Sequence, residues 1–400
     1  MREGLFVCFV HPVLLKVMKA STQNEFRVPK RLQGIEKSMI RQIADRALPD
    51  SINFGLGEPD LQTPDCIRNE AVRVIQNEQN GYTLQAGLVP LREKIVSTYP
   101  HLNLATNDVI VTVGSSEALF IALMTLAEEG DEVLVPDPSF PAYWGIINMT
   151  GAKMTKYRLP AEKGFAFDLD EFKEQITDKT RVVMVLSPSN PTGRVHTRDE
   201  LKSIAEVLNG TGIYVISDEI YSDVYFTDER PASISEFYDK TLIVGGLSKA
   251  MSMTGWRLGW LTGTSEVMKS AFILHGYDVT CVSAISQKAA LKAWTDEGQL
   301  AMANAREIYK KRREHILREI KTQLNLPAIS PEGAFYTMLD VRSLADDEME
   351  ICEKFLQNRV ITIAGKAFGD ETKGFLRLSF CCDETKITEG IRRMKEALGK

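Results

Sequence analysis

Short apolar segments alternate with segments of helical pattern between about residue 65 and residue 290, and this alternation constrains the fold more than any other feature. The apolar segments have the length of buried β-strands and lie at 109–113, 132–135, 153–159, 181–186, 213–216 and 241–244. Helical patterns separate several of them, at 117–128, 170–176 and 198–208. Because strands that alternate with helices need right-handed crossovers, we expect an α/β fold with a mostly parallel sheet covered by helices on both faces.

The last hundred or so residues have a different pattern. A long charged amphipathic helix is predicted over 296–324, and two β-like runs, YTMLDV and FLRLSF, follow Pro331. Helices are predicted beside these runs, at 346–358 and 387–398. Short strands mixed with helices predict a second, smaller α+β domain.

The predicted domains are discontinuous along the chain. Residues 61–296 form the large domain, while both chain ends, 25–60 and 297–400, form the small one. Residues 1–24 remain as an N-terminal arm or extension.

Composition excludes several partners. Lys plus Arg number 48 and Asp plus Glu 54, so the formal net charge is −6 and offers no general attraction to nucleic acid or anionic lipid. No stretch reaches the roughly 18 apolar residues of a membrane helix. The six cysteines lack metal-ligand spacing, so we expect free thiols in a reducing, cytoplasmic compartment and no metal site.

The apolar run LFVCFVHPVLL at 5–15 allows several interpretations. It is long enough for the apolar part of a signal peptide, but Glu3 precedes it, Pro12 interrupts it and VMKAS after it is a poor cleavage site. The alternatives are an arm that packs on a partner subunit and a start assigned too early, with Met18 as the true one.

Five predicted strand ends carry polar residues. Their segments are GSSE at 114–117, PDPSF at 136–140, SPSNPTG at 187–193, DEIY at 218–221 and SK at 248–249. Ligand sites in open α/β sheets lie beyond the carboxyl ends of the strands. The five segments can therefore converge on one ligand.

Several of these residues suit a phosphorylated ligand with a carbonyl group. Ser248 and Arg257 suit a phosphate, and so do the amides at the start of the helix after Val113. Lys249 lies between Ser248 and Arg257 in the sequence and suits a carbonyl, because cationic neighbours and partial burial lower the pKa of a lysine amine and make it a nucleophile. Asp218 ends an apolar run, where a carboxylate needs a cation or a protonated nitrogen. Each feature alone also has an ordinary explanation, such as a helix cap, a turn or a solvated lysine.

The combination resembles the class I and II aminotransferases of the fold type I pyridoxal-phosphate enzymes, and in particular the prokaryotic aspartate and aromatic aminotransferases. The resemblance covers the chain from about Val28 to the C-terminus. The motifs that carry it are GEPD at 57–60, SNPTG at 189–193, DEIY at 218–221, SKAMSMTGWRLGW at 248–260 and FLRLSF at 375–380.

The resemblance implies pyridoxal 5′-phosphate as cofactor and three catalytic residues. Lys249 would form the internal aldimine and carry a proton between the substrate α-carbon and the cofactor. Asp218 would keep the pyridinium nitrogen protonated, and Tyr221, with Asn190, would hydrogen-bond the phenolic oxygen. The remaining implied cofactor contacts are the phosphate ligands Ser115, Ser116, Ser248 and Arg257, the ring-stacking Phe140, and Tyr82, which would reach the phosphate of the neighbouring subunit in a homodimer.

The resemblance also implies the reaction. Arg377 would bind the substrate α-carboxylate in a bidentate fork, while Gly57 would let the backbone approach it and Asn190 would lie beside it. The enzyme would move an amino group from an L-amino acid to a 2-oxo acid, such as 2-oxoglutarate, by a ping-pong mechanism. A carbon–sulfur β-lyase is the alternative, because it would share every cofactor contact and differ in substrate positioning.

The sequence departs from the family pattern at two places. Ala364 and Gly365 stand where relatives often have Pro-Gly, and Ser116 stands where some aspartate-active prokaryotic relatives have a lysine that binds a side-chain carboxylate. We therefore expect a broad or neutral-to-aromatic amino donor. A second cation for a dicarboxylic substrate would come from the N-terminal segment, where the candidates are Lys30, Arg31, Lys37 and Arg41.

Overall fold

The computed structural model of the chain describes residues 27–399. Contacts divide the chain into one unit that ends at Glu36 and a second that begins at Lys37. The described part of the first unit contains one 3-10 turn, η1 (Lys30–Leu32). The apolar run at 5–15 and the predicted arm at 1–24 lie outside the described residues, so both stay predictions.

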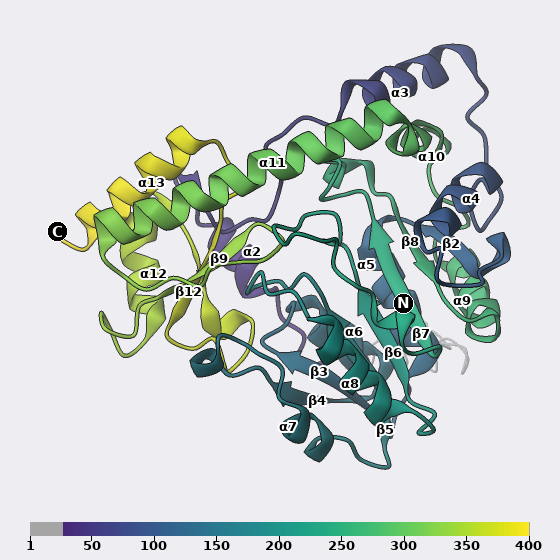
Figure 1. The fold of residues 1–400 in the computed structure, drawn as a ribbon, viewed down its shortest axis with the longest axis horizontal. Helices are drawn as coiled ribbons and strands as arrows, with labels where there is room; N and C mark the ends of the chain where they lie inside the picture. The colour runs from purple at the N-terminus through teal and green to yellow at the C-terminus, as the bar shows by residue number, and fades with distance from the viewer. Residues whose placement is uncertain (1–26, 400) are drawn as a thin grey trace, which may run out of the picture. The chain divides into compact units, whose positions relative to one another are not determined.

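A seven-stranded sheet forms the centre of the second unit (Figure 1). In sheet order its strands are β2 (Val109–Thr112), β8 (Gly259–Thr262), β7 (Thr241–Gly246), β6 (Tyr214–Asp218), β5 (Thr180–Leu186), β3 (Glu132–Asp137) and β4 (Lys153–Arg158). The pairs from β7 to β4 are parallel, and only β8 runs against its neighbours. The mostly parallel sheet is confirmed, but β8 was missed, because its four residues include a glycine and lie inside a motif with no strand-like alternation.

Helices cover both faces of this sheet. Val182 and Met184 of β5 share an apolar cluster with residues of α5 (Gly114–Leu126), α6 (Ala142–Thr150) and α9 (Ser265–Asp278). The alternate residue Val183 packs instead with residues of α7 (Leu169–Glu174) and α8 (Arg198–Leu208). Because successive strand residues point to opposite faces, these two clusters show that the sheet is buried on both sides.

Local sequence explains the helix boundaries. The side chain of Thr197 accepts a hydrogen bond from the Glu200 amide, and the Glu200 carboxylate accepts one from the Thr197 amide. This capping box begins α8 at Arg198, as predicted. The buried residues of α8, Leu201, Ile204, Ala205 and Leu208, recur at helical spacing.

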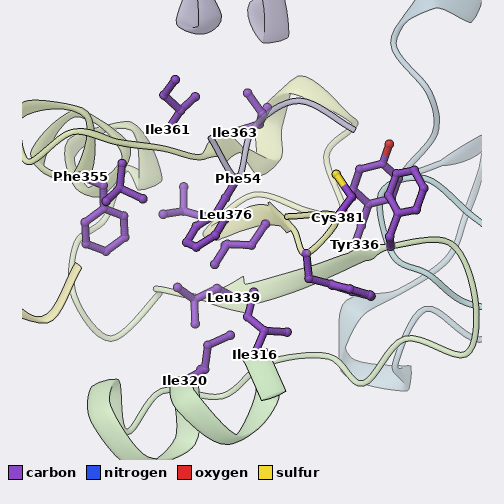
Figure 2. Close-up of a cluster of buried hydrophobic side chains, with 14 of the residues drawn as sticks. Phe54, Ile316, Ile320, Tyr336, Leu339, Phe355, Ile361, Ile363, Leu376 and Cys381 are labelled. Carbon is purple, nitrogen blue, oxygen red and sulfur yellow. The ribbon is translucent and has the colours of Figure 1, made fainter. Parts of the chain in front are cut away.

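The two ends of the second unit share another apolar core. Near the start, β1 (Ile52–Asn53) pairs in parallel with β10 (Val360–Ile361), far along the chain. A three-stranded antiparallel sheet, β11 (Ile363–Ala364), β12 (Phe375–Ser379) and β9 (Tyr336–Asp340), lies beside them. Figure 2 shows the core, which contains Phe54, Phe355 and Leu376. The domain boundaries themselves stay a prediction.

The remaining helices complete the second unit. Helix α11 (Asp296–Glu319) runs from α3 (Asp65–Asn77) to α13 (Glu384–Ala397), and a π turn (Ile320–Leu324) follows it (Figure 1). The other helices are α2 (Met39–Ala44), α4 (Val89–Thr98), α10 (Ala284–Ala290) and α12 (Glu348–Gln357). Among the described residues no helix has both the length and the apolar character needed to cross a membrane.

Candidate active site

A cavity of about 550 Å³ lies at the carboxyl ends of the parallel strands. All five strand-end segments singled out in the sequence contribute to its wall. Every predicted site residue except Tyr82 lines it: Gly57, Ser115, Ser116, Phe140, Asn190, Asp218, Tyr221, Ser248, Lys249, Arg257 and Arg377. The fold therefore brings together residues that lie more than 300 positions apart in the chain, such as Gly57 and Arg377.

Lys249 follows β7 and points its amine toward the first residues of the GEPD segment. Its Nζ donates a hydrogen bond to the Gly57 carbonyl at 2.9 Å and lies 5.9 Å from the ring centre of Tyr221. Burial lowers the pKa of Lys249 to about 8, and the charges of Arg377 and Arg257 act in the same direction. The neutral, nucleophilic amine is therefore more populated near neutral pH than that of an exposed lysine.

Asp218 ends β6 and is only 3 % exposed. Its carboxylate accepts hydrogen bonds from the Tyr143 hydroxyl at 2.7 Å and from the Ile220 amide at 3.3 Å. Burial raises the pKa of Asp218 to about 6 despite these two donors. A protonated ring nitrogen in the cavity would stabilise the ionised form. Tyr143, on α6, was missed by the sequence reasoning, because no local pattern links it to a residue 75 positions away.

Arg377, on β12, is a buried cation without an ion-pair partner among the described residues. It is 1 % exposed and donates from Nη1 to the Asn190 side-chain oxygen at 2.8 Å and from Nη2 to the Gly55 carbonyl. Its Nε finds no hydrogen-bond partner in the described part of the chain. Burial lowers the pKa of Arg377. A guanidinium held this way suits a carboxylate that can take two parallel hydrogen bonds.

A tyrosine pair closes the cavity beside Arg377. The hydroxyls of Tyr221 and Tyr336 lie 2.7 Å apart, and the Arg377 guanidinium lies 4.3 Å from the centre of the Tyr336 ring. A Cβ at Gly57 would collide with the Tyr336 hydroxyl, so the close approach that requires glycine here is to this tyrosine. Tyr336, on β9, was also missed. The only sequence feature that pointed to Tyr336 was its place in the β-like run YTMLDV.

The start of α5 lies beside the guanidinium of Arg257. Ser115 and Ser116 lie in the first turn of α5, where backbone amides are free of helical partners. Arg257 donates from Nη1 to the Thr254 carbonyl at 2.8 Å and from Nη2 to the Val113 carbonyl at 3.3 Å. A Cβ on Gly114 would collide with this guanidinium. Helix amides, hydroxyls and a guanidinium together suit a phosphate.

Tyr82 lies outside the cavity. Its side chain is 91 % exposed, in the loop between α3 and α4. The loop is held from inside the chain, since Gln287 Nε2 donates to the Thr83 hydroxyl at 3.1 Å and His275 Nε2 lies 2.8 Å from the Gln85 carbonyl. Within one chain, Tyr82 therefore contributes nothing to the cavity wall.

Comparisons with known proteins agree with this geometry. The sequence profile of the family described as aminotransferase class I and II matches residues 49–394. A probable aspartate aminotransferase of Methanocaldococcus jannaschii is 33% identical over 378 residues, which are 92% of this chain and 99% of the relative. The solved structure of aspartate aminotransferase from Thermus thermophilus with maleate is similar with a TM-score of 0.89 at 30% identity, covering 93% of this chain and 100% of that chain. That of the aromatic aminotransferase from Pyrococcus horikoshii is similar with a TM-score of 0.84 at 31% identity, covering 90% of this chain and 98% of that chain.

Proposed function

Because the chain belongs to the class I and II aminotransferases, we propose that it moves an amino group from an L-amino acid to a 2-oxo acid by a ping-pong mechanism that uses pyridoxal 5′-phosphate. The observation that carries the proposal is the convergence of Lys249, Asp218 and Arg377 on one cavity. The relatives are named aminotransferases, so the carbon–sulfur β-lyase alternative is not favoured.

The residues of the cavity fit pyridoxal phosphate. Arg257 and the start of α5 suit its phosphate, and the buried carboxylate of Asp218 suits its ring nitrogen. The amine of Lys249 suits its aldehyde, because its lowered pKa favours the nucleophilic form. When bound, this cofactor supplies an aldehyde that condenses with amines and a protonated ring that withdraws electrons from the substrate α-carbon.

The chain's own residues would position the substrate and move one proton. Arg377 would bind the α-carboxylate, with Asn190 holding one of its nitrogens in place at 2.8 Å. Lys249 would take the proton from the α-carbon, since an amine with a pKa of about 8 can accept and return a proton near neutral pH. Tyr221, held by Tyr336, would donate to the phenolic oxygen of the ring.

2-Oxoglutarate is the proposed acceptor. It is a dicarboxylic 2-oxo acid, and the Thermus thermophilus relative is described with maleate, which is also a dicarboxylate. The proposal extends to the cytoplasm as the compartment, for which the free thiols of the five described cysteines are the support.

We further propose a homodimer in which Tyr82 reaches the neighbouring subunit's cavity. Large apolar side chains are exposed on α3, on α9 and in the loop that contains Tyr82: Val72, Ile75, Leu84, Ile273 and Tyr277. Exposed apolar residues on α3, α9 and the loop between α3 and α4 are typical of a protein–protein interface. They support a partner surface of the same chain.

Replacing Lys249 by alanine tests the proposed function. Purified protein incubated with pyridoxal phosphate is expected to show the visible absorbance band of cofactor attached to a lysine, and a donor amino acid is expected to bleach it. Lys249→Ala should lose the band and at least about 1,000-fold in rate, because it removes both the attachment point and the proton carrier. Lys202→Ala, at an exposed lysine, is the control.

An unchanged band in Lys249→Ala would overturn the assignment. A screen of twenty amino acids for bleaching identifies the donor. Release of pyruvate and ammonia from cystathionine, without bleaching by any amino acid, would support the β-lyase in place of amino transfer.

A further inference from the structure

Arg41 is a cation on the cavity wall and has no role in the proposed reaction. It lies in α2 and lines the cavity together with Ser38 and Ile40. Its guanidinium makes no hydrogen bond or ion pair with another residue between 27 and 399. Two nearby cations do form ion pairs: Lys37 pairs with Asp45, and Arg46 pairs with Glu353 at 2.7 Å.

The placement of α2 is determined by packing. Ser38 caps the helix by accepting from the Arg41 amide, and Ile43 is buried in the core that also contains Ile363. Helix α2 packs on β11, where Ile363 is the register partner of Arg377 on β12. Arg41 and Arg377 therefore line one cavity from elements that are packed on each other.

The charges on the cavity wall do not balance. Four cationic side chains, Arg41, Lys249, Arg257 and Arg377, face two anionic ones, Glu58 and Asp218, so cations exceed anions by two. In the proposed reaction Arg257 binds the phosphate, Arg377 the α-carboxylate and Lys249 the aldehyde. Arg41 is the one cation on the described cavity wall that remains without a role.

We infer that Arg41 binds the distal carboxylate of a dicarboxylic substrate and thereby selects dicarboxylic over neutral 2-oxo acids. The inference rests on the proposed function. A guanidinium matches a carboxylate through two parallel hydrogen bonds. Of the four cations suggested by the sequence, Lys37 is paired outside the cavity wall, while Lys30 and Arg31 belong to the first unit. Ser116 is exposed on the wall and supplies no charge.

The test compares a dicarboxylic acceptor with a neutral acceptor of equal chain length. The holoenzyme carrying Arg41→Gln is assayed with 2-oxoglutarate and with 2-oxopentanoate, using a donor that bleaches the parent's band. We expect kcat/KM for 2-oxoglutarate to fall about 10- to 100-fold, the effect of one charge-assisted pair. The value for 2-oxopentanoate should stay within about two-fold, as should both values in the control Lys37→Gln, whose exposed pair contributes little.

A binding measurement separates this inference from the proposed function. The spectral shift of the bound cofactor gives the Kd of maleate, a dicarboxylate, and of isocrotonate, its monocarboxylate counterpart with the same cis geometry, without turnover. Arg41→Gln should weaken maleate binding about 10-fold or more and leave isocrotonate binding unchanged. A parent protein that binds cofactor but transfers no amino group would contradict the proposed function, while maleate binding would still decide the role of Arg41.

Three results would overturn the inference. Equal losses with the dicarboxylic and the neutral ligand would show that Arg41 does not distinguish them. No loss with either would show that it does not contact the substrate. Loss of the visible band at a cofactor concentration that saturates the parent protein would assign Arg41 to the cofactor instead.

Discussion

At the scale of single residues, burial determines the chemistry of the site. Burial removes Lys249 and Asp218 from water and disfavours their charged forms. It lowers the pKa of the amine to about 8 and raises that of the carboxyl to about 6. Both shifts favour the neutral form of each group. A ligand with a protonated nitrogen and an aldehyde would use the carboxylate of one and the neutral amine of the other.

Asp218 predicts a pH-dependent stability of the cofactor-free protein. Its folded pKa of about 6 lies above the ordinary 3.8, so the folded state binds the proton more tightly than the unfolded state. The resulting loss of stability is absent below about pH 4, grows as the pH rises and is complete above about pH 6. Asp218→Asn should therefore stabilise the cofactor-free protein by about 1–3 kcal/mol at pH 8 and by less at pH 5.

Urea unfolding at the two pH values measures this effect. Asp239→Asn, at an exposed aspartate, is the control and should change little. A gain from Asp218→Asn that is as large at pH 5 as at pH 8 would show that the carboxylate is not the source of the pH dependence.

At the scale of elements, the turn from β2 into α5 creates the proposed phosphate site. Gly114 has a φ of +76°, and the guanidinium of Arg257, itself at a φ of +53°, lies over the place where a Cβ would stand. The helix start is therefore close to a cation only because its first residue has no side chain.

Gly114→Ala should displace Arg257 and weaken cofactor binding about 10-fold or more, by loss of a charge-assisted contact. Gly130→Ala is the matched control, because Gly130 also has a positive φ, of +105°, but has open space around its Cβ position. Both variants should lose about 1 kcal/mol of unfolding free energy from backbone strain. Only Gly114→Ala should raise the Kd of pyridoxal phosphate, measured by titration of the absorbance band. Equal cofactor affinity in the two variants would contradict the prediction.

At the scale of the whole molecule, residues from distant parts of the second unit build one site. Strand β1 pairs with β10, and Arg312 of α11 binds Asp60 at 2.6 Å across 252 positions of sequence. These contacts hold the GEPD segment beside β12, so that the Gly57 carbonyl meets Lys249 and the Gly55 carbonyl meets Arg377. Lys249 and Arg377, the residues proposed to meet cofactor and substrate, are thereby held in one framework.

The proposed dimer predicts complementation between two defective subunits. Lys249→Ala and Tyr82→Ala protomers, mixed by unfolding and refolding, should form dimers in which one site has both residues intact. With random pairing, about a quarter of the sites become complete. The activity of the mixture should therefore exceed the mean activity of the Lys249→Ala and Tyr82→Ala proteins refolded separately. No gain on mixing would show that Tyr82 does not act across a subunit interface. Refolded single variants are the controls.

The sequence alone determined the α/β fold class and the positions of the polar strand ends, because apolar periodicity and local motifs report what each segment buries. The tertiary structure decided which partners those residues have. The reversed direction of β8, the bond of Tyr143 to Asp218, the pairing of Tyr336 with Tyr221 and the choice of Arg41 among four cations depend on contacts between distant segments. Local pattern cannot report such contacts, since burial and hydrogen-bond partners arise only when the sheet and the core bring the segments together.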